Sequence, residues 1–381
     1  MRSLIALTYY RPHVSGLTIY AERLARGLAR RGHAVTVLTA RFAPALPARE
    51  TADGVDVVRV PILSKVSKGV IMPSFPFYAA AFVGRCDVVN VHMPQFEAAL
   101  LAGLGRVLRR GVVLTYQCDL QLPSGWFNRV VEASLRPLNT LAARSAHAVV
   151  TTSEDYARHS PFLSRYTGRV HAIAPPVDLP APAAAETARL AEGWQLDRGP
   201  RIGFAARFAA EKGVEYLLRA LPAVLAALPE ARVVFTGAYK DTVGEEAYWQ
   251  RLSPLLERFR DRLVFLDLLS AAAMPSFYTL CDVVAVTSLN STEAFGMVQV
   301  EAMLCGTPVV ATDLPGVREP VRRTGMGRVV PPRDPDSLAA ALIDVVRNRA
   351  SYVRPREAVA AAFDSEQSLR AYEALFEAVR G

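Results

Sequence analysis

One stretch, residues 282–312, constrains the fold of this chain more than any other. It opens with an apolar strand pattern, Asp282-Val-Val-Ala-Val-Thr287, and after Gly296 the apolar residues take the spacing of a helix. Gly306 ends that helix, and a second apolar strand follows at residues 309–312. A strand, a helix and a strand in this order predict a parallel unit. The glycine before the helix suits a bound phosphate, because free N–H groups and the positive end of the helix dipole lie there.

Two glutamates flank this glycine. Glu293 precedes it and Glu301 lies on the helix, with seven residues between them. The pair alone is a weak signal, because helices are rich in Glu, and an ordinary βα unit with solvated glutamates is the alternative. The whole order, with Glu-Ala-Phe-Gly before the helix and Gly-Thr-Pro-Val-Val-Ala-Thr after it, is more specific. It resembles the signature of the retaining glycosyltransferases of family 4 (glycosyl transferases group 1), which have the GT-B fold and use nucleotide sugars.

The resemblance implies a role for each part of this segment. Glu293 is expected to be catalytic and to hold the hydroxyls of the donor sugar near the reaction centre. Glu301 is expected to hydrogen-bond the ribose. Donor contacts are expected from four residues at the start of the helix: Phe295, Gly296, Met297 and Val298. No cofactor is implied, since the nucleotide sugar is itself a substrate.

A second motif begins at Gly203 and reads Gly-Phe-Ala-Ala-Arg-Phe-Ala-Ala-Glu-Lys-Gly. It follows an apolar strand pattern and resembles the Gly-Arg…Glu-Lys-Gly element of the same family. By this resemblance Arg207 and Lys212 clamp the diphosphate and act in catalysis. Two fixed cations stabilise the charge that grows on a departing nucleoside diphosphate, so no divalent metal is expected. The base is expected near Leu268, in the loop after another strand.

The N-terminal half offers candidate residues for the acceptor. Its first strand leads into the loop Tyr10-Arg-Pro-His-Val-Ser-Gly-Leu17. This loop resembles the one where the family often has a Gly-Gly pair near the donor phosphate and the acceptor. Ser15 stands in place of the first glycine and Gly16 keeps the second, so Gly16 is expected to contact the donor. His13 is a candidate acceptor ligand, and a plain surface histidine is the alternative.

Two further strand patterns end in polar residues, at His92 and at Gln117-Cys-Asp119. The family commonly has histidine where Gln117 stands. Gln117 is therefore expected to be a catalytic residue that binds the donor sugar by hydrogen bonds, without titrating near neutrality. This departure favours retention by front-face attack, in which the departing phosphate takes the acceptor proton. His92 and Asp119 are candidate acceptor ligands, and for His92 the alternative is a buried core histidine.

Strand and helix patterns alternate along both halves, which predicts an α/β chain with two doubly wound parallel sheets. In the GT-B fold that the resemblance implies, two Rossmann-like domains face a central cleft. The Pro-rich segment after Ala174 is typical of a linker. Residues 1–174 are therefore expected to bind the acceptor and residues 175–362 the nucleotide sugar. The last helix, within residues 363–381, is expected to pack back on the first domain.

Charge is divided unevenly along the chain. Residues 1–175 carry 21 Lys and Arg against 10 Asp and Glu, and the remaining residues carry 23 against 26. A basic first half implies an anionic partner, which is nucleic acid, an anionic membrane surface or a phosphate-bearing acceptor. The segment around Trp126, Phe127 and Arg129 mixes aromatic and basic residues, as segments that lie in a lipid headgroup layer do. A helix packed on the core with a solvated basic face is as common.

The cysteines and the apolar runs indicate where the chain works. Four cysteines without a Cys-x-x-Cys pair predict reduced thiols and no metal site. No apolar run approaches the length of a transmembrane helix. The chain is therefore expected in the cytoplasm, or peripherally on the inner face of the membrane.

The resemblance and the composition together give the expected function. It is transfer of a hexose from a nucleoside diphosphate sugar, with UDP-hexose favoured and GDP-mannose open, to a glycan or lipid-linked acceptor in cell-envelope or exopolysaccharide synthesis. A sugar-nucleotide epimerase or hydrolase on the same fold is the second hypothesis. A nucleic-acid-binding protein is a distant third, because no recognisable nucleic-acid module occurs in the sequence.

Overall fold

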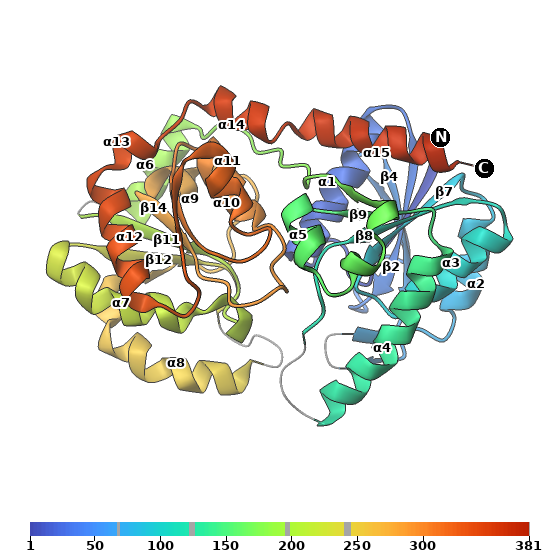
Figure 1. Ribbon diagram of the computed structural model, residues 1–381, viewed down its shortest axis with the longest axis horizontal. Helices are drawn as coiled ribbons and strands as arrows, with labels where there is room; N and C mark the ends of the chain where they lie inside the picture. The colour runs from blue at the N-terminus through green and yellow to red at the C-terminus, as the bar shows by residue number, and fades with distance from the viewer. Residues whose placement is uncertain (67–68, 122–125, 195–198, 240–244, 381) are drawn as a thin grey trace. The chain divides into compact units, whose positions relative to one another are not determined.

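The computed structural model describes residues 1–66, 69–121, 126–194, 199–239 and 245–380. The chain divides into two compact units. Unit 1 comprises Met1–Pro176 and Asp364–Gly381, and unit 2 comprises Val177–Phe363. Each unit is a sheet of mainly parallel strands with helices packed against it (Figure 1).

Unit 1 contains an eight-stranded sheet within the described residues. Its strands, in spatial order, are β10 (Val170–Ala172), β9 (Ala148–Thr151), β8 (Gly111–Tyr116), β7 (Val88–Met93), β1 (Arg2–Ala6), β2 (Ala34–Arg41), β4 (Val55–Pro61) and β3 (Arg49–Ala52). The chain starts at the central strand β1, builds outward through β2 and β4, and then returns to build the other side from β7. The strand order therefore reverses between β1 and β7, which is where ligands bind in open sheets of this kind.

The edge strand β3 was not predicted from the sequence. It pairs with β4 in the antiparallel direction, whereas the other neighbouring strands described in this sheet are parallel. Its residues, Arg-Glu-Thr-Ala, are mostly exposed, so they show no apolar pattern. Strand β5 (Ser64–Val66) pairs with β6 (Gly69–Ile71) in the antiparallel direction and forms a separate two-stranded sheet.

The helices of unit 1 are α1 (Gly16–Arg30), α2 (Phe75–Val83), α3 (Ala98–Val107), α4 (Trp126–Ser145), α5 (Glu154–His159) and α15 (Ser365–Val379). Helix α1 starts at Ser15, whose hydroxyl accepts a hydrogen bond from the backbone N–H of Thr18. A serine that satisfies a free N–H group in this way is a favourable N-cap. The buried face of α1 includes Tyr20, Leu24 and Leu28, as the helical spacing predicts.

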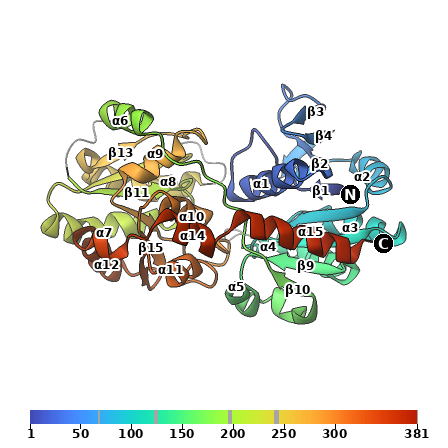
Figure 2. The same cartoon turned by 90° about the horizontal axis from the view of Figure 1, so that it is seen from above.

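The C-terminal helix α15 lies beside α1 in both views of the chain (Figures 1 and 2). Its buried residues recur at helical spacing, at Leu369, Tyr372 and Phe376. The hydroxyl of Tyr372 lies 2.7 Å from that of Tyr20 on α1 and 3.2 Å from the hydroxyl of Thr115 on β8. A polar contact inside an apolar interface fixes the register of the helix on the sheet, because unpaired buried hydroxyls are costly.

Unit 2 repeats the doubly wound pattern. In spatial order, its six-stranded sheet within the described residues contains β13 (Leu263–Phe265), β12 (Arg232–Thr236), β11 (Arg201–Ala205), β14 (Val283–Val286), β15 (Val309–Thr312) and β16 (Gly327–Val330). The described strand pairs are parallel. The order reverses between β11 and β14. Two doubly wound sheets were predicted from the sequence, and both are confirmed.

The helices of unit 2 are α6 (Ala184–Gly193), α7 (Val214–Ala227), α8 (Glu246–Arg258), α9 (Met274–Leu280), α10 (Met297–Leu304), α11 (Glu319–Thr324), α12 (Pro335–Arg347), α13 (Arg349–Tyr352) and α14 (Arg356–Ala362). Helix α10 begins at Met297, directly after Gly296. Gly296 is its N-cap and has φ of +75°, which is not a helical conformation, so the helix cannot extend further toward the N-terminus. Gly306, just beyond the helix, also has φ of +75°, as predicted for a residue after a helix.

Candidate functional site

The loops after β11 and β14 lie side by side at the carboxyl edge of the unit 2 sheet. The hydroxyl of Thr287, just beyond β14, donates to the carbonyl of Lys212 at 2.8 Å. The backbone N–H of Leu289 donates to the carbonyl of Glu211 at 2.9 Å. The strand order reverses at this point, so the sequence motifs around Arg207 and Glu293 meet where an open α/β sheet binds its ligands.

Gly213 allows these two loops to approach so closely. Its φ is +65°, and a Cβ atom placed on it would lie 2.4 Å from the backbone carbonyl oxygen of Thr287. A side chain here would therefore clash with a backbone atom that cannot move away without distorting β14. The glycine of the Glu-Lys-Gly motif is thus required by the packing of one loop on the other.

The carboxylate of Glu293 joins both motifs. Its Oε2 accepts a hydrogen bond from Lys212 Nζ at 2.5 Å, and its Oε1 accepts one from the backbone N–H of Gly296 at 3.0 Å. About a fifth of each of the two side chains, Lys212 and Glu293, is exposed. One carboxylate therefore spans a cation from the first motif and the N-cap of helix α10. The two residues were predicted separately, and the structure brings them into contact.

The guanidinium of Arg207 pairs with Glu211, four residues further along the same loop. The Arg207 side chain is 38% exposed and that of Glu211 is 15% exposed, so the cation remains accessible. Sequence reasoning gave Glu211 no role, although its spacing from Arg207 was visible. Each of the two cations in the candidate site therefore has its own carboxylate partner.

The residues around the start of α10 differ in burial. Phe295 is buried, and its ring packs edge-to-face on Phe363 with the centroids 5.8 Å apart. Met297 and Val298, in the first turn, are half-buried. The backbone of this turn, with N–H groups that the helix itself cannot satisfy, is the part suited to hold an anion.

Glu301 is buried one turn further along α10. Its Oε2 accepts a hydrogen bond from the hydroxyl of Tyr278 on α9 at 2.7 Å. Tyr278 is completely buried, and in the sequence it is one aromatic residue within a short apolar helix, so no pattern marked it. The contact fixes the orientation of the carboxylate that was predicted to bind a ribose.

Leu268 lies in the loop after β13 and is 57% exposed. The carbonyl of the preceding residue, Asp267, accepts hydrogen bonds from the Thr236 hydroxyl and the Gly237 N–H, both at 2.9 Å. These bonds tie the loop to the end of β12. A hydrogen bond to the Asp267 carboxylate raises the pKa of the Tyr239 hydroxyl. Because Thr236 and Gly237 already donate hydrogen bonds to the Asp267 carbonyl, the part of this loop that is open to a ligand is the exposed Leu268.

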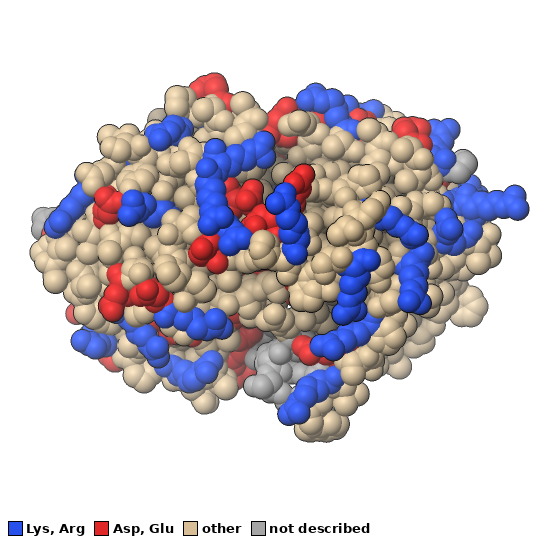
Figure 3. Space-filling view, in the orientation of Figure 1, with Lys and Arg blue, Asp and Glu red and all other residues tan. Residues whose placement is uncertain are grey.

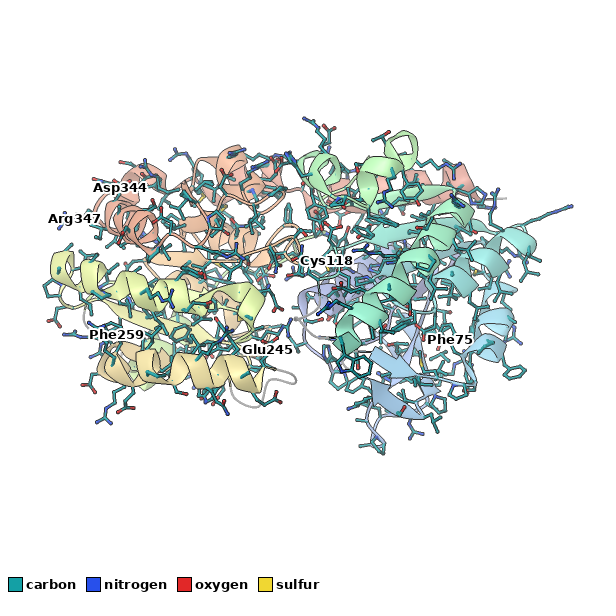
Figure 4. The ribbon with its side chains drawn as sticks, turned by 60° about the horizontal axis from the view of Figure 1, so that its bottom comes forward. Phe75, Cys118, Glu245, Phe259, Asp344 and Arg347 are labelled. Atoms are coloured by element: carbon teal, nitrogen blue, oxygen red, sulfur yellow. The ribbon has the colours of Figure 1, made fainter. Side chains whose placement is uncertain are left out.

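Glu245, labelled in Figure 4 just before α8, also contacts the first motif. It is 5% exposed, and its Oε2 accepts a hydrogen bond from the backbone N–H of Ala210 at 3.1 Å. This carboxylate holds the turn between Arg207 and Lys212 in place. It was missed in the sequence because a lone Glu before a helix has many ordinary roles.

In unit 1, His92 and Gln117 form a buried pair at the ends of β7 and β8. Gln117 Nε2 lies 2.5 Å from His92 Nδ1 and 3.3 Å from the carbonyl oxygen of Leu17, in the first turn of α1. His92 is 2% exposed and Gln117 is 7% exposed. Burial lowers the pKa of His92 to about 3, so the ring is neutral at ordinary pH.

Asp119 lies two residues beyond Gln117, next to Cys118, which is labelled in Figure 4. Its Oδ1 accepts hydrogen bonds from the hydroxyls of Tyr116 at 2.8 Å and Ser160 at 2.7 Å. Its backbone N–H donates to the hydroxyl of Tyr156 at 2.6 Å. Its Oδ2 is buried and has no hydrogen-bond partner among the described residues. The structure thus fixes this carboxylate by one oxygen.

The loop after β1 carries His13, the remaining acceptor candidate, and Gly16, which was predicted to contact the donor. His13 is half-buried, and its ring stacks on Tyr9 with the centroids 4.9 Å apart. Gly16 is exposed as the first residue of α1. Ser15, which stands where the family often has glycine, serves as the helix N-cap. This local role explains a serine at that position.

Two further properties concern metals and membranes. Among the described residues, no group of three or more His, Cys, Asp or Glu side chains is placed to hold a metal ion. Within the described part of the chain, no helix has the length and apolarity needed to cross a bilayer.

Both halves of the chain match known protein families. Residues 199–348 match the family described as "Glycosyl transferases group 1", and residues 15–176 match the one described as "Glycosyl transferase 4-like domain". The first match contains all the candidate donor-binding residues of unit 2. The second contains Gly16, His92, Gln117 and Asp119.

The chain is also similar to individual proteins whose names or structures are those of glycosyltransferases or of nucleotide-sugar complexes. The chain is 31% identical to a GDP-mannose-dependent alpha-mannosyltransferase of Mycolicibacterium smegmatis, over 86% of this chain and 84% of the relative. It is 33% identical to a phosphatidyl-myo-inositol mannosyltransferase of the same species, over half of each chain. In structure it is similar to the Anabaena protein HepE in complex with UDP-glucose, with a TM-score of 0.79, 20% identity and coverage of 99% of this chain and 100% of the other.

Proposed function

This chain belongs to the group 1 glycosyl transferases, nucleotide-sugar-dependent enzymes with the GT-B fold, and from that membership we propose a hexosyltransferase that retains anomeric configuration. Its donor is a UDP-hexose, with GDP-mannose as the alternative. Its acceptor is a glycan or a lipid-linked saccharide of the cell envelope or of an exopolysaccharide. Unit 2 binds the donor, and unit 1 binds the acceptor.

The observation that carries this proposal is the contact of Lys212, Glu293 and Gly296 at the reversal point of the unit 2 sheet. There the Glu293 carboxylate accepts from the Lys212 ammonium at 2.5 Å and from the N–H at the start of helix α10 at 3.0 Å. A nucleotide sugar needs positive charge and N–H donors at its diphosphate, and a hydrogen-bond acceptor at its sugar hydroxyls. These three groups supply both.

Cleavage of the donor leaves negative charge on a nucleoside diphosphate. Arg207, Lys212 and the first turn of α10 would stabilise that charge more in the transition state than in the ground state, and this difference lowers the barrier. The positive charge comes from side chains and backbone, so the proposed transfer requires no divalent metal. Glu293 would hold the sugar hydroxyls, and Glu301 the ribose.

The acceptor would attack on the face from which the diphosphate leaves. The bond from the anomeric carbon to the diphosphate oxygen breaks, the bond to the acceptor oxygen forms, and the acceptor proton passes to the departing phosphate. This route needs no titrating base at position 117. Gln117 would hydrogen-bond the donor sugar, Gly16 would approach the donor phosphate, and His13 and Asp119 would contact the acceptor.

A thermal-shift panel tests the donor assignment. We expect UDP-glucose at about one hundred times its dissociation constant to raise Tm by roughly 5–10 °C, because a ligand of the native state stabilises by mass action. GDP-mannose and ADP-glucose should give smaller shifts, and EDTA should not change the result. A shift with GDP-mannose alone would replace UDP-hexose as the donor, and no shift with any of the three would contradict the proposed function.

Variants locate the diphosphate in the same experiment. Arg207→Ala and Lys212→Ala should each weaken UDP binding by about 10- to 100-fold, since each removes a charge-assisted hydrogen bond. Arg260→Ala, on the surface of the same unit with 70% of its side chain exposed, is the matched control and should bind normally. Unchanged affinity in both loop variants would place the diphosphate elsewhere.

Consumption of the nucleotide sugar at the full rate in the absence of any acceptor would indicate the second hypothesis, a sugar-nucleotide epimerase or hydrolase.

We propose further that unit 1 associates with an anionic membrane through α4. Trp126 and Val130 are 76% and 55% exposed at the start of this helix, and Arg129 and Arg136 are exposed beside them. Basic side chains gather along the face where α4 lies (Figure 3). Exposed apolar and basic residues on one helix suit a peripheral position in a headgroup layer. Phe127 contributes to the sequence pattern, but its side chain lies outside the described residues.

Liposome flotation tests this association. We expect the protein to float with phosphatidylglycerol vesicles at low salt and to be released at high salt, because screening weakens the attraction. Arg129→Gln and Arg136→Gln should each lower binding about fivefold, or about 1 kcal/mol. Trp126→Ser should also weaken it, whereas Val107→Ser, at an equally exposed apolar residue on α3, should not. Absence of flotation at low salt would favour a water-soluble acceptor.

A further inference from the structure

The side-chain amide of Gln117 has one orientation in the structure, and its neighbours fix it. The nitrogen Nε2 faces His92 Nδ1 at 2.5 Å and the Leu17 carbonyl at 3.3 Å. A carbonyl oxygen only accepts hydrogen bonds, so the group that faces Leu17 must be the amide nitrogen. That nitrogen has two hydrogens, and these two acceptors use both.

The same contact fixes the protonation of the His92 ring. An amide nitrogen only donates, so His92 Nδ1 must carry a lone pair and the neutral ring must carry its hydrogen on Nε2. That Nε2 is buried and has no hydrogen-bond partner among the described residues. Burial supports the neutral form, since it lowers the pKa of His92 to about 3. The ring stands edge-to-face to Tyr20, with the centroids 5.7 Å apart, so packing also restricts its rotation.

The carbonyl oxygen of Gln117 is left on the other side of the amide. No described residue donates a hydrogen bond to this Oε1. The oxygen is not fully buried. Gln117 as a whole is 7% exposed. The accessible polar atom of this side chain is therefore an acceptor.

We propose that His92 is a positioning residue: its Nδ1 and the Leu17 carbonyl take both amide hydrogens of Gln117, which then presents only its carbonyl oxygen to a sugar hydroxyl. This inference rests on the proposed contact of Gln117 with the donor sugar. It assigns His92 an indirect role in place of direct acceptor binding. It also defines the contact chemically, because the sugar must donate a hydroxyl hydrogen at this point.

The variants that test it differ in one acceptor atom. In His92→Asn the side-chain oxygen replaces Nδ1, and in His92→Leu the acceptor is lost while apolar volume remains. Binding of UDP and of UDP-glucose is measured by calorimetry for each variant, and the ratio of the two affinities reports the sugar contact. Gln117→Ala should lower this ratio about tenfold, as loss of one partnered hydrogen bond does. His92→Leu should lower it almost as much, and His92→Asn should retain it.

The double variant Gln117→Ala, His92→Leu separates positioning from general damage. If His92 acts through Gln117, the double variant has the same affinity ratio as Gln117→Ala alone, because coupled residues are not additive. Additive losses would overturn the inference, as would an unchanged ratio in His92→Leu beside a lowered one in Gln117→Ala. Affinity for UDP itself should stay the same in all four variants, because the nucleotide is held by unit 2 in the proposed function and both substituted residues lie in unit 1.

A second measurement needs neither donor nor variant activity. Nitrogen-15 NMR of the six histidines should show one non-titrating ring protonated on Nε2 only, and His92→Asn should remove that signal. A ring protonated on Nδ1, or on both nitrogens, would overturn the inference. The expected signal together with no binding of UDP-glucose would instead leave the amide orientation intact and refute the proposed donor.

Discussion

Replacing Glu293 with glutamine is expected to lower the transfer rate at least about a hundredfold, or about 2.7 kcal/mol in the barrier. The carboxylate accepts from two donors, Lys212 Nζ and the Gly296 N–H, through its two oxygens. A glutamine side chain has only one oxygen, so its amide NH2 group would face one of these donors, and two donors cannot hydrogen-bond each other. The variant therefore loses both the charge and the geometry that the proposed reaction requires. The rate is measured as release of UDP from UDP-glucose, with and without added acceptor.

The protein should remain folded, because one oxygen of the glutamine can still accept from Gly296 at the N-cap of α10. Breaking a hydrogen bond to a charged group costs about 1.5–3 kcal/mol, within the stability of an ordinary domain. Glu257→Gln removes the same charge from an exposed ion pair with Arg260 in the same unit and should keep the full rate. A loss below about tenfold in Glu293→Gln would contradict the role assigned to this carboxylate.

The architecture could be predicted because its signals are local. Buried parallel strands are continuous apolar runs, and most of these runs alternate with a segment of helical spacing. Together with the rule that crossover connections are right-handed, this alternation leaves few topologies. Elements without such a pattern were missed. The exposed antiparallel strand β3 and the short strand β16, Gly-Arg-Val-Val, are two of these.

The position of the candidate donor site also followed from the sequence. Arg207 and Lys212 come after one strand and Glu293 comes after another. In a doubly wound sheet the carboxyl ends of these strands share an edge. The order of the strands makes them neighbours, since β11 pairs directly with β14. Contact between Lys212 and Glu293 is a consequence of that pairing.

The partners of these residues could not be predicted, because they depend on atomic geometry. Glu245 lies just before α8 and Tyr278 lies on α9, and the sequence patterns there describe only burial or exposure. The amide of Gln117 is a further example. The register of β7 and β8 places His92 opposite Thr115, so Gln117 lies beyond the paired residues. Only the fold shows that its side chain turns back to His92.

Acid is expected to destabilise unit 1 through His92. Its pKa in the folded protein is about 3, because burial disfavours the charged ring, whereas an unfolded histidine titrates near 6.5. Between these values the unfolded chain binds a proton that the folded chain does not. The free energy of unfolding must therefore fall as the pH falls, by about 1.4 kcal/mol per pH unit, and this loss is absent above pH 6.5.

The comparison of wild type with His92→Asn isolates this contribution. Asparagine keeps the acceptor for Gln117 but cannot be protonated, so the variant should lack the slope that His92 contributes. Urea unfolding is measured between pH 5.0 and 6.5 and is monitored by hydrogen exchange of the β7 and β8 amides. These amides report the unfolding of unit 1 separately from that of unit 2. Over this range the difference between the two proteins should change by about 2 kcal/mol, in favour of the variant as the pH falls.

The matched control is His171→Asn, at an exposed histidine on β10 of the same sheet. This residue lies away from the buried pair of His92 and Gln117, so the variant should show the same difference from His92→Asn as the wild type does. All carboxylates of the chain are present in all three proteins, so the comparison uses only the differences between the proteins. Parallel pH profiles for wild type and His92→Asn would show that His92 accepts a proton in the folded state. The ring would then be reachable by water, and the hydrogen bond from Gln117 could not hold it in one neutral form.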